Sequence, residues 1–448
     1  MISVSSRKRI IIRFKVFFSI FLCNIDNRRI KIFYRFLGDR MDYLERIEDP
    51  IEWEKYYTYC ESSGHIGKRD LRMLREYIDR RKYSIVLDNI KNAVPFPYPK
   101  KYILNKIGVD KKRIVYTYDE AEKYVLKIIA FLLHEKDKIF ADNLFSFRHD
   151  QGVRKAIASL VNKPDISEYY SYKLDIHDYF NSVNVERILP RLQKVLIKEE
   201  ATYNLIKEIL LNPFVIDEEG EIVEERKGIM AGVPISSFLA NLYLMDMDWY
   251  FQNKRISYAR YSDDIIVFAK SRAELEGHRE YIESYLFREG LTINPKKIYY
   301  SEPYGEWNFL GIKYINGVVD VSDVSLKKMK GKMRRKARAL YRWKIKNNAS
   351  DERAIRAYIR VINNKLYNNP NNHELTWTRW FFPLINTSDS LHKLDRYFLE
   401  CIRYIATGKH TKANYNLRYR TIKEYGYRSL VNEYYKKKKS KQQEDEML

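Results

Sequence analysis

A chain of 448 residues is long enough for one large multi-lobed catalytic unit or for two to three domains. It carries 82 lysines and arginines against 59 acidic residues, a formal net charge of +23, and such a field attracts polyanions, with nucleic acid as the first candidate. The three cysteines, Cys23, Cys60 and Cys401, lie far apart and outside any zinc-binding spacing. This excludes a zinc module and a disulfide framework and indicates a reducing cytoplasm.

The first forty residues are basic and place arginines before an apolar run, Ile10 to Cys23. That run is too short to span a membrane and is interrupted by Arg13 and Lys15. No small-residue cleavage site follows it, so a secretory leader is not favoured. We expect no membrane association, and we expect the functional chain to begin near Met41, with residues 1–40 as an upstream translation or a flexible arm.

From Asp42 to about Asp88 the apolar residues recur at helical spacing, as Leu71, Leu74 and Ile78 do. Three prolines between Val94 and Pro99 end this helical region. A basic cluster, Lys111 to Arg113, then leads into a strand. An amphipathic helix is predicted from about Asp119 to His134.

The middle of the chain contains a helical stretch, a hairpin and a glycine-marked loop. The pattern predicts a helix over Lys194–Asn212 and a β-hairpin over Phe214–Lys227 that turns at Glu219-Gly220. Gly228 to Leu244 is predicted as a loop that leads into an apolar helix ending near Met247.

The stretch Ile256–Lys270, ISYARYSDDIIVFAK, has the pattern of a second hairpin, with Asp263 and Asp264 at its polar tip. Two adjacent carboxylates beside so apolar a strand either face bulk water or share a divalent cation. Upstream, Tyr172–Val183 reads as a strand ending on Asp175, whose carboxylate could complete a cation site between neighbouring strands. Oxygen ligands select Mg²⁺ or Mn²⁺, and a pair of such ions clamps the attacking and leaving oxygens of phosphoryl transfer.

The segment Val324–Ser350 holds eleven lysines and arginines and no acidic residue. Its apolar residues keep helical spacing, so one face packs while the other is strongly positive and suits phosphate binding. A solvated helix with diffuse charge is the alternative. Further helices are predicted over Asp351–Leu366 and Asp389–Ala406.

Five segments in this order resemble the motifs of reverse transcriptases. Tyr261-Ser262-Asp263-Asp264 resembles the Tyr-x-Asp-Asp box, and Asp175 with Phe180 resembles the first palm motif. The other three are Gly232–Asn241 (GVPISSFLAN), Gly290–Lys297, which resembles the lysine motif, and Phe309–Ile312, which resembles the primer grip. In addition, Asn143–Arg154 is similar to the family's Gly-Phe-Arg segment, with Ser146 where a glycine is more usual.

The resemblance implies an α+β right-hand polymerase. Fingers over residues 41–170 would be followed by a ferredoxin-like palm with an antiparallel sheet over 171–315, which contains a fingers insertion around 190–230. Residues 316–448 would form an all-helical thumb and RNA-binding region.

The resemblance also implies roles for individual residues. Two ions of Mg²⁺, or Mn²⁺, would be held by Asp175, Asp263, Asp264 and the main-chain carbonyl of Ile176. Lys297, or its neighbour Lys296, would protonate the leaving pyrophosphate. The implied nucleotide-binding residues are Lys112, Arg113, Arg148, Phe180, Gly232 and Pro234, of which Phe180 would exclude a ribose and so select dNTPs. The implied primer and template contacts are Tyr261, Phe309, Leu310 and Gly311, with Asp178 as a helix cap nearby. The implied RNA-binding residues are Lys327, Lys328, Lys330, Lys332, Arg334, Arg335, Lys336 and Arg338.

The predicted function is that of a cytoplasmic RNA-directed DNA polymerase that copies an associated non-coding RNA in antiphage defence. The layout resembles the bacterial defence-associated and abortive-infection reverse transcriptases, which are related to the group II intron and retron enzymes. Its partners would be the template RNA, the DNA product and dNTPs, and its oligomeric state stays open. Ala231 stands where many family members carry glutamine. A template-independent, protein-primed polymerase therefore remains an alternative, and a non-catalytic RNA-binding scaffold is another.

Overall fold

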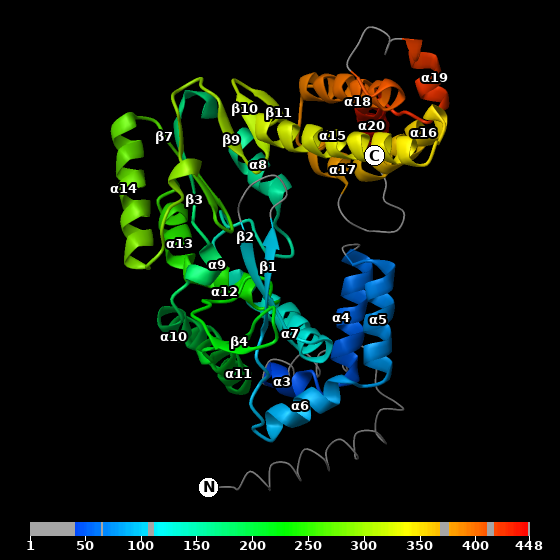
Figure 1. The fold of residues 1–448 in the computed structure, drawn as a ribbon. Coiled ribbons are helices and arrows are strands. Elements are labelled where there is room, and N and C mark those ends of the chain that lie inside the picture. Colours follow the sequence, from blue (N-terminus) through cyan, green and yellow to red (C-terminus); the bar gives the residue numbers. More distant parts are fainter. Residues whose placement is uncertain (1–40, 64–65, 106–111, 368–375, 410–415, 447–448) are drawn as a thin grey trace, which may run out of the picture.

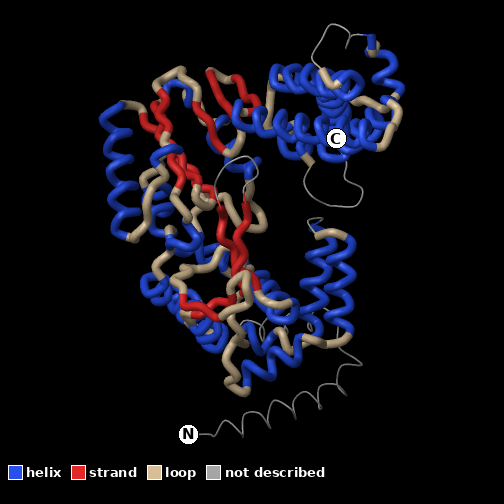
Figure 2. Tube along the Cα trace, viewed as in Figure 1, coloured by secondary structure: helices blue, strands red, loops and turns tan. Residues whose placement is uncertain are grey.

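The computed structural model describes residues 41–63, 66–105, 112–367, 376–409 and 416–446, and within them three sheets are surrounded by helices (Figures 1 and 2). The fold class is α+β, as predicted. Residues 1–40, with Cys23 and the expected N-terminal extension, lie outside the described part, as does Lys111.

The central sheet is antiparallel throughout, with the strand order β6-β7-β3-β8. Its strands are β3 (Tyr170–Asp175), β6 (Tyr258–Tyr261), β7 (Asp264–Ala269) and β8 (Tyr299–Ser301). Helices lie between β3 and β6, and α14 (Arg272–Arg288) lies between β7 and β8. This order of strands and helices is ferredoxin-like, so the prediction for the palm sheet is confirmed.

The apolar run of β7 is explained by burial on both faces of the sheet. Ile265 and Val267 belong to one hydrophobic core, which extends into the N-terminal half of the chain. Ile266 and Phe268 alternate with them and belong to a second core, shared with the C-terminal helices. Because side chains alternate along a strand, only a strand that is covered on both sides has this continuous apolar sequence.

The N-terminal region is divided into several helices, where the sequence predicted one continuous helical pattern. They are α3 (Tyr43–Arg46), α4 (Pro50–Ser63), α5 (Lys68–Asp79) and α6 (Tyr83–Lys91). The turns between them allow Trp53 to be buried, stacked on Tyr83 with 4.6 Å between the ring centroids. Its indole donates a hydrogen bond to the carbonyl of Ile47 at 2.8 Å.

The predicted strand and the predicted helix that follow are both present. β1 (Lys100–Asn105) pairs antiparallel with β2 (Lys112–Thr117), and α7 (Glu120–Leu133) comes next. The remaining elements before the site are the 3₁₀ turns η2 (His134–Ile139) and η3 (Ile166–Glu168) and the helices α8 (Val153–Val161) and α9 (Tyr179–Ser182).

The predicted helix over Lys194–Asn212 is two helices, α10 (Val185–Val195) and α11 (Glu200–Leu211). α10 begins earlier than expected because the Asn184 side chain caps it, accepting from the amide of Arg187. The hairpin that follows is confirmed as β4 (Phe214–Ile216) and β5 (Ile222–Glu224). β4 pairs with β1, which gives a second sheet of order β2-β1-β4-β5.

The apolar helix predicted to end near Met247 is interrupted earlier and extends further. It ends as α12 (Ser236–Tyr243), and α13 (Met245–Asn253) continues the chain. The Arg191 guanidinium donates a hydrogen bond to the carbonyl of Tyr243. A side chain that takes a helix carbonyl in this way is a recognised cause of a helix break.

The C-terminal third joins a small sheet to a group of helices. β9 (Trp307–Phe309), β10 (Ile312–Ile315) and β11 (Val318–Val321) form an antiparallel sheet that leads directly into the long helix α15. The helices are α15 (Asp323–Lys346), α16 (Asp351–Leu366), α17 (Trp377–Phe381), α18 (Asp389–Thr407), α19 (Tyr419–Glu424) and α20 (Leu430–Glu446). Among the described residues, no helix has the length and apolar composition needed to cross a membrane.

Candidate active site

The pairing of β3 with β7 brings together the two acidic segments found in the sequence. Asp175, the last residue of β3, lies opposite Asp264, the first residue of β7. The amide of Ile176 donates to the carbonyl of Asp263 at 3.1 Å, and the amide of Asn294 donates to the carbonyl of Asp175 at 2.9 Å. The main chain therefore fixes Asp175 and Asp263 as neighbours at one end of the sheet, as the sequence predicted.

The carboxylates in this cluster repel one another in a partly buried setting. Burial raises the pKa of Asp263 to about 6, and the charges of Asp175 and Asp264 add to the effect. Burial also raises the pKa of Asp264, against the opposing charge of Lys173. Desolvation and like charge act in the same direction here, so positive charge at this position stabilises the ionised site.

Two lysines supply part of that positive charge. Lys297 forms an ion pair with Asp175, and the ammonium of Lys173 lies 3.4 Å from a carboxylate oxygen of Asp264. Lys297 ends the 3₁₀ turn η4 (Pro295–Lys297), where the Asn294 side chain accepts from the amide of Lys296 at 3.3 Å. Of the two lysines considered from the sequence, Lys297 is thus the one paired with the carboxylates.

The predicted set of three metal-ligating carboxylates is not assembled around one point. Among the described residues, no group of three histidine, cysteine, aspartate or glutamate side chains is arranged to hold a metal ion. Asp264 is instead paired with Lys173. Asp175 and Asp263, with the nearby main chain of Ile176, still fit a hard cation, because Mg²⁺ is usually bound through one or two carboxylates together with substrate phosphates.

Phe180 lies on α9, immediately after the strand that carries Asp175. It is half-buried, and its ring packs edge to face against the ring of Phe147, with 6.1 Å between the ring centroids. Its carbonyl accepts from the amide of Ile229 at 2.9 Å. A Cβ at Gly228 would stand 2.5 Å from that same carbonyl, so only glycine allows the loop after β5 to lie this close to Phe180.

The loop that carries Gly232 and Pro234 is bound to the sheet of β1 and β2. The amide of Tyr116 donates to the carbonyl of Ala231 at 2.8 Å, and a Cβ at Gly232 would stand 2.7 Å from the carbonyl of Tyr116. Arg113 is exposed on the same strand, β2. The side chain of its neighbour Lys112 lies outside the described part.

Three of the predicted site residues have other contacts than expected. Nη1 of Arg148 donates to the carbonyls of Ala141 at 2.7 Å and Leu144 at 3.2 Å, so this nitrogen holds the main chain of its own segment, and a contact with phosphate stays a prediction. The side chain of Phe309 is fully buried in the second core and has no exposed surface for the predicted contact with a primer. Asp178 precedes α9 but its side chain does not cap the helix; it accepts from the Asn181 amide group at 3.1 Å.

Gly311 is required for a reason that the sequence did not show. It has a positive φ of 83° in the tight turn between β9 and β10, after Leu310, which is partly buried and also has positive φ. A Cβ at Gly311 would stand 2.9 Å from the hydroxyl of Ser325 on α15. The glycine thus allows close contact with the following helix, where the prediction was close contact with a primer.

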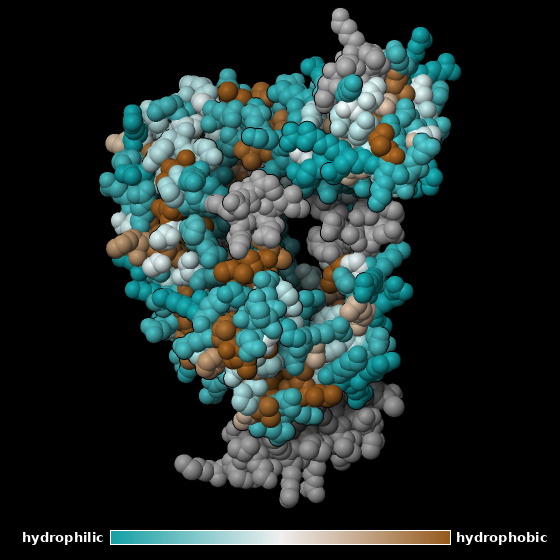
Figure 3. All heavy atoms as spheres, viewed as in Figure 1, coloured by the Kyte–Doolittle hydropathy of each residue, from teal (hydrophilic) through white to brown (hydrophobic). Residues whose placement is uncertain are grey.

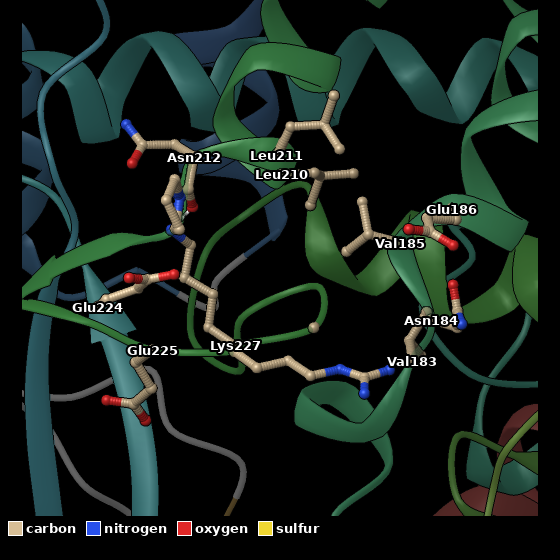
Figure 4. A pocket seen from close by; sticks show the side chains of 13 residues that line it. Val183, Asn184, Val185, Glu186, Leu210, Leu211, Asn212, Glu224, Glu225 and Lys227 are labelled. Atoms are coloured by element: carbon tan, nitrogen blue, oxygen red, sulfur yellow. Dashed lines mark hydrogen bonds between the residues drawn. The ribbon is translucent and has the colours of Figure 1, made fainter.

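A cavity that the sequence did not predict lies between α10, α11 and the β4–β5 hairpin (Figure 4). Its volume is about 710 Å³, and Asn212, Glu224 and Lys227 lie on one side, opposite Val185 and Glu186. Burial lowers the pKa of Lys227 to about 8. Gly228 contributes to the lining, but Asp175 and Asp263 do not. The cavity therefore adjoins the loop of Gly228, which contacts Phe180, and is separate from the carboxylates.

A ferredoxin-like sheet with paired strand-end carboxylates and a facing lysine is the arrangement that the sequence predicted for the palm of a polymerase. The comparisons narrow the class. Residues 99–314 match the model of the family described as reverse transcriptase (RNA-dependent DNA polymerase). The match covers slightly less than half of the chain and includes all four strands of the central sheet, with Asp175 and Asp263.

Two curated relatives from Escherichia coli are similar to this chain. The retron Ec86 reverse transcriptase is 25% identical over 198 residues, which cover 43% of this chain and 57% of the relative. The retron Ec83 reverse transcriptase is 27% identical over 159 residues, which cover 34% of this chain and 49% of the relative. The chain thus spans about half the length of the curated relatives it matches.

Solved telomerase structures are also similar to this chain. The apo telomerase of Candida tropicalis, truncated from its C-terminal domain, has a TM-score of 0.39 and 12% identity, over 51% of this chain and 56% of that one. The telomerase of Candida albicans in complex with a fragment of telomeric RNA has a TM-score of 0.41 and 10% identity, over 78% and 66%.

The raised pKa of Asp263 gives a test of the site without any substrate. Its folded-state pKa of about 6 exceeds the ordinary 3.8, so the ionised carboxyl destabilises the metal-free fold above about pH 6. We expect Asp263→Asn to raise the free energy of unfolding by about 1–3 kcal/mol at about pH 7.5. This gain should shrink as the pH falls from about 6 towards 4, where the folded protein already binds the proton.

Chemical denaturation in the presence of a chelator, at about pH 7.5 and about pH 5, measures this difference. Asp142→Asn, at an exposed position, is the matched control and should change stability little at either pH. Equal stability of Asp263→Asn and the unaltered protein at the higher pH would contradict the assignment of a strained carboxylate cluster.

Proposed function

We propose that this protein is an RNA-directed DNA polymerase that adds deoxynucleotides to a primer in a reaction dependent on Mg²⁺. The observation that carries the proposal is the placement of Asp175, Asp263 and Lys297 at one end of the central sheet of a reverse transcriptase domain. A site without catalytic activity would have no reason to keep carboxylates whose burial, together with their mutual repulsion, raises their pKa values.

The acidic and basic residues of the site would have different roles in nucleotide addition. Asp175 and Asp263 would bind the divalent ions through carboxylate oxygens, and the ions supply charge neutralisation at the attacking oxygen and the α-phosphate. Lys297, which forms an ion pair with Asp175, would donate a proton to the leaving pyrophosphate once a cation neutralised Asp175 in its place. Lys173 holds Asp264 beside the other two carboxylates.

The first test is incorporation of labelled dNTPs on an RNA template with a DNA primer, with and without Mg²⁺. We expect Asp263→Ala to lower the rate at least about a thousand-fold, because the cation then loses a ligand that no neighbour replaces. Asp142→Ala should leave the rate unchanged. Incorporation that survives Asp263→Ala, or that proceeds in a chelator, would exclude this site as the catalyst.

Phe180 is the proposed selector of deoxynucleotides. Phe180 follows the strand of Asp175 on α9, and its half-buried ring contacts Phe147. In this proposal the ring lies beneath the sugar of the incoming nucleotide, where a ribose 2′-hydroxyl would collide with it. Phe180→Ala should lower the preference for dNTPs over rNTPs by at least about ten-fold while incorporation of dNTPs continues, since an added hydroxyl is rejected only by a close contact.

Ratios of kcat/KM for each dNTP and its rNTP measure that preference. Phe287→Ala, which alters an exposed phenylalanine on α14, is the control. An unchanged ratio in Phe180→Ala would show that another residue selects the sugar.

The basic helix α15 is the proposed binding surface for RNA. Leu326, Met329, Met333 and Ala337 are buried against the second core, which leaves most of the lysines and arginines towards solvent. On the face shown in Figure 3 the surface along α15 is hydrophilic, whereas some residues of the other C-terminal helices are apolar. Lys344 is an exception to the predicted positive face: it is buried and donates to the carbonyls of Ile405 and Ala406, at the end of α18.

Neutralising four exposed residues of α15 should weaken RNA binding about ten- to a hundred-fold and make it less dependent on salt. The variant changes Lys327, Lys328, Arg335 and Arg338 to glutamine. Its matched control changes four exposed basic residues of the α10–α11 region, namely Arg187, Lys194, Lys198 and Lys207. Fluorescence anisotropy with a structured RNA at several salt concentrations gives both quantities. Equal loss in the two variants would indicate diffuse charge rather than a binding face.

A template-independent polymerase is the second candidate, and it is favoured by Ala231. This residue is buried, and its main-chain amide and carbonyl are both bound, to Asn181 and Tyr116. Its methyl side chain cannot contribute the polar contact that glutamine makes in many family members. Sequencing the products separates the candidates, since complementary DNA supports templated synthesis and random or homopolymeric DNA does not. The defence role, the identity of the RNA and the cytoplasmic location stay predictions.

A further inference from the structure

Buried side chains form hydrogen bonds to the main chain of the turn that carries Asp263. Ser262 lies directly before Asp263, is buried and has a positive φ of 60°, a conformation that a residue with a side chain rarely adopts. Its amide donates to the hydroxyl oxygen of Ser146 at 2.9 Å. Its carbonyl accepts from the guanidinium of Arg260 at 3.4 Å. Both polar main-chain groups of this strained residue are thus satisfied by side chains.

Ser146 belongs to a segment that lies alongside β6. The amide of Arg260 donates to the carbonyl of Asn143, and the amide of Phe145 donates to the carbonyl of Arg260, each at 3.0 Å. These two hydrogen bonds hold the segment that contains Ser146 beside β6, next to the turn that carries Asp263. They place the hydroxyl of Ser146, which is fully buried, directly under the amide of Ser262.

Asn241 on α12 completes the contacts of Ser146. The Ser146 hydroxyl donates to the side-chain oxygen of Asn241 at 3.2 Å, and the Asn241 amide group donates to the carbonyl of Ser146 at 2.9 Å. The hydroxyl therefore donates to one partner and accepts from another, which uses its proton and a lone pair. Three separate segments meet at this one oxygen.

A buried ion pair fixes the other side of the network. The guanidinium of Arg260 donates to Asp248 through Nε at 2.8 Å, and the hydroxyl of Tyr258 donates to the same carboxylate at 2.9 Å. Arg260 also donates to the carbonyl of Asn241 at 3.2 Å. Arg260, Asp248 and Asn241 are all fully buried. A buried polar network in which each contact is made is rigid, because any displacement leaves a desolvated group without a partner.

We propose that Ser146 is a positioning residue for Asp263: its hydroxyl holds the amide of Ser262 and so fixes the carboxylate that follows. The proposal rests on the proposed polymerase function. It also gives a reason for the departure from the family pattern, where glycine is more usual. A glycine here would leave the buried amide of Ser262 without this acceptor and Asn241 without this donor.

A purely packing role is the competing explanation, since a small residue suits the close approach of the three segments. Threonine and valine at position 146 separate the two roles, because they have the same shape and differ only in the hydroxyl. Any clash from the added methyl group is common to both. The difference between Ser146→Thr and Ser146→Val therefore reports the hydroxyl alone, and Ser146→Ala adds a variant without extra bulk.

The experiment measures kcat, the KM for dNTP and the Mg²⁺ concentration that gives half-maximal activity. For Ser146→Ala, and for Ser146→Val relative to Ser146→Thr, we expect kcat to fall roughly ten- to a hundred-fold, as small displacements of catalytic groups do. The half-activating Mg²⁺ concentration should rise several-fold while the KM for dNTP stays nearly constant. Ser159→Ala, which removes a hydroxyl bonded within α8, is the control and should change none of the three.

The outcomes distinguish this proposal from the function on which it rests. No incorporation by the unaltered protein overturns the polymerase function itself, and full activity in Asp263→Ala excludes this site as the catalyst. With that function intact, equal kcat and equal Mg²⁺ dependence in the threonine and valine variants overturn the role of Ser146. A loss of activity in Ser146→Ala accompanied by an equal loss in Ser159→Ala would do the same.

Discussion

The antiparallel pairing of β3 with β7 is the constraint on which the site depends. Its register places Asp175 opposite Asp264. The next main-chain hydrogen bond, from the amide of Ile176 to the carbonyl of Asp263, holds the ends of the two strands together. A slip of one residue would turn every side chain of β7 to the other face. Because both faces of β7 are buried in different cores, that slip would expose neither face to water and would disrupt the packing of both. The same apolar packing that stabilises the sheet thus fixes the distance between the carboxylates.

This arrangement lowers the stability of the fold at the proposed active site. Carboxylates are gathered in a setting that raises the pKa values of Asp263 and Asp264, which costs folding free energy whenever they are ionised. Lys297 and Lys173 offset part of that cost. Lys297 is half-exposed, so its ion pair with Asp175 would allow it to move aside for the proposed cation and triphosphate. Among the described residues, the carboxylates are therefore neutralised in part by lysines that a cation would replace, and they are not arranged as a complete set of metal ligands.

The sequence predicted the hairpin of Asp263, the strand ending on Asp175 and the helices after Asp351 and Asp389, because each is marked by local apolar periodicity. It did not predict contacts that depend on three dimensions. Arg148 was expected at a phosphate but holds carbonyls of its own loop, and Phe309 was expected at a primer but fills the second core. Neither outcome is encoded in the spacing of residues. The break between α12 and α13 likewise follows from an arginine on α10, far away in sequence.

The turn of Gly311 connects the small sheet of β9, β10 and β11 to the proposed RNA-binding helix. The amide of Ser322 donates to the carbonyl of Gly311 at 2.9 Å, and the side chain of Ser322 then caps α15. Ser325 on the first turn of α15 lies so close that no Cβ fits at position 311. The buried face of α15 shares its core with Ile266 and Phe268 of β7, the strand that carries Asp264. The basic face of α15 is therefore fixed relative to the carboxylates by direct packing, so a nucleic acid bound along this helix would lie at a defined distance from the point where a nucleotide would be added.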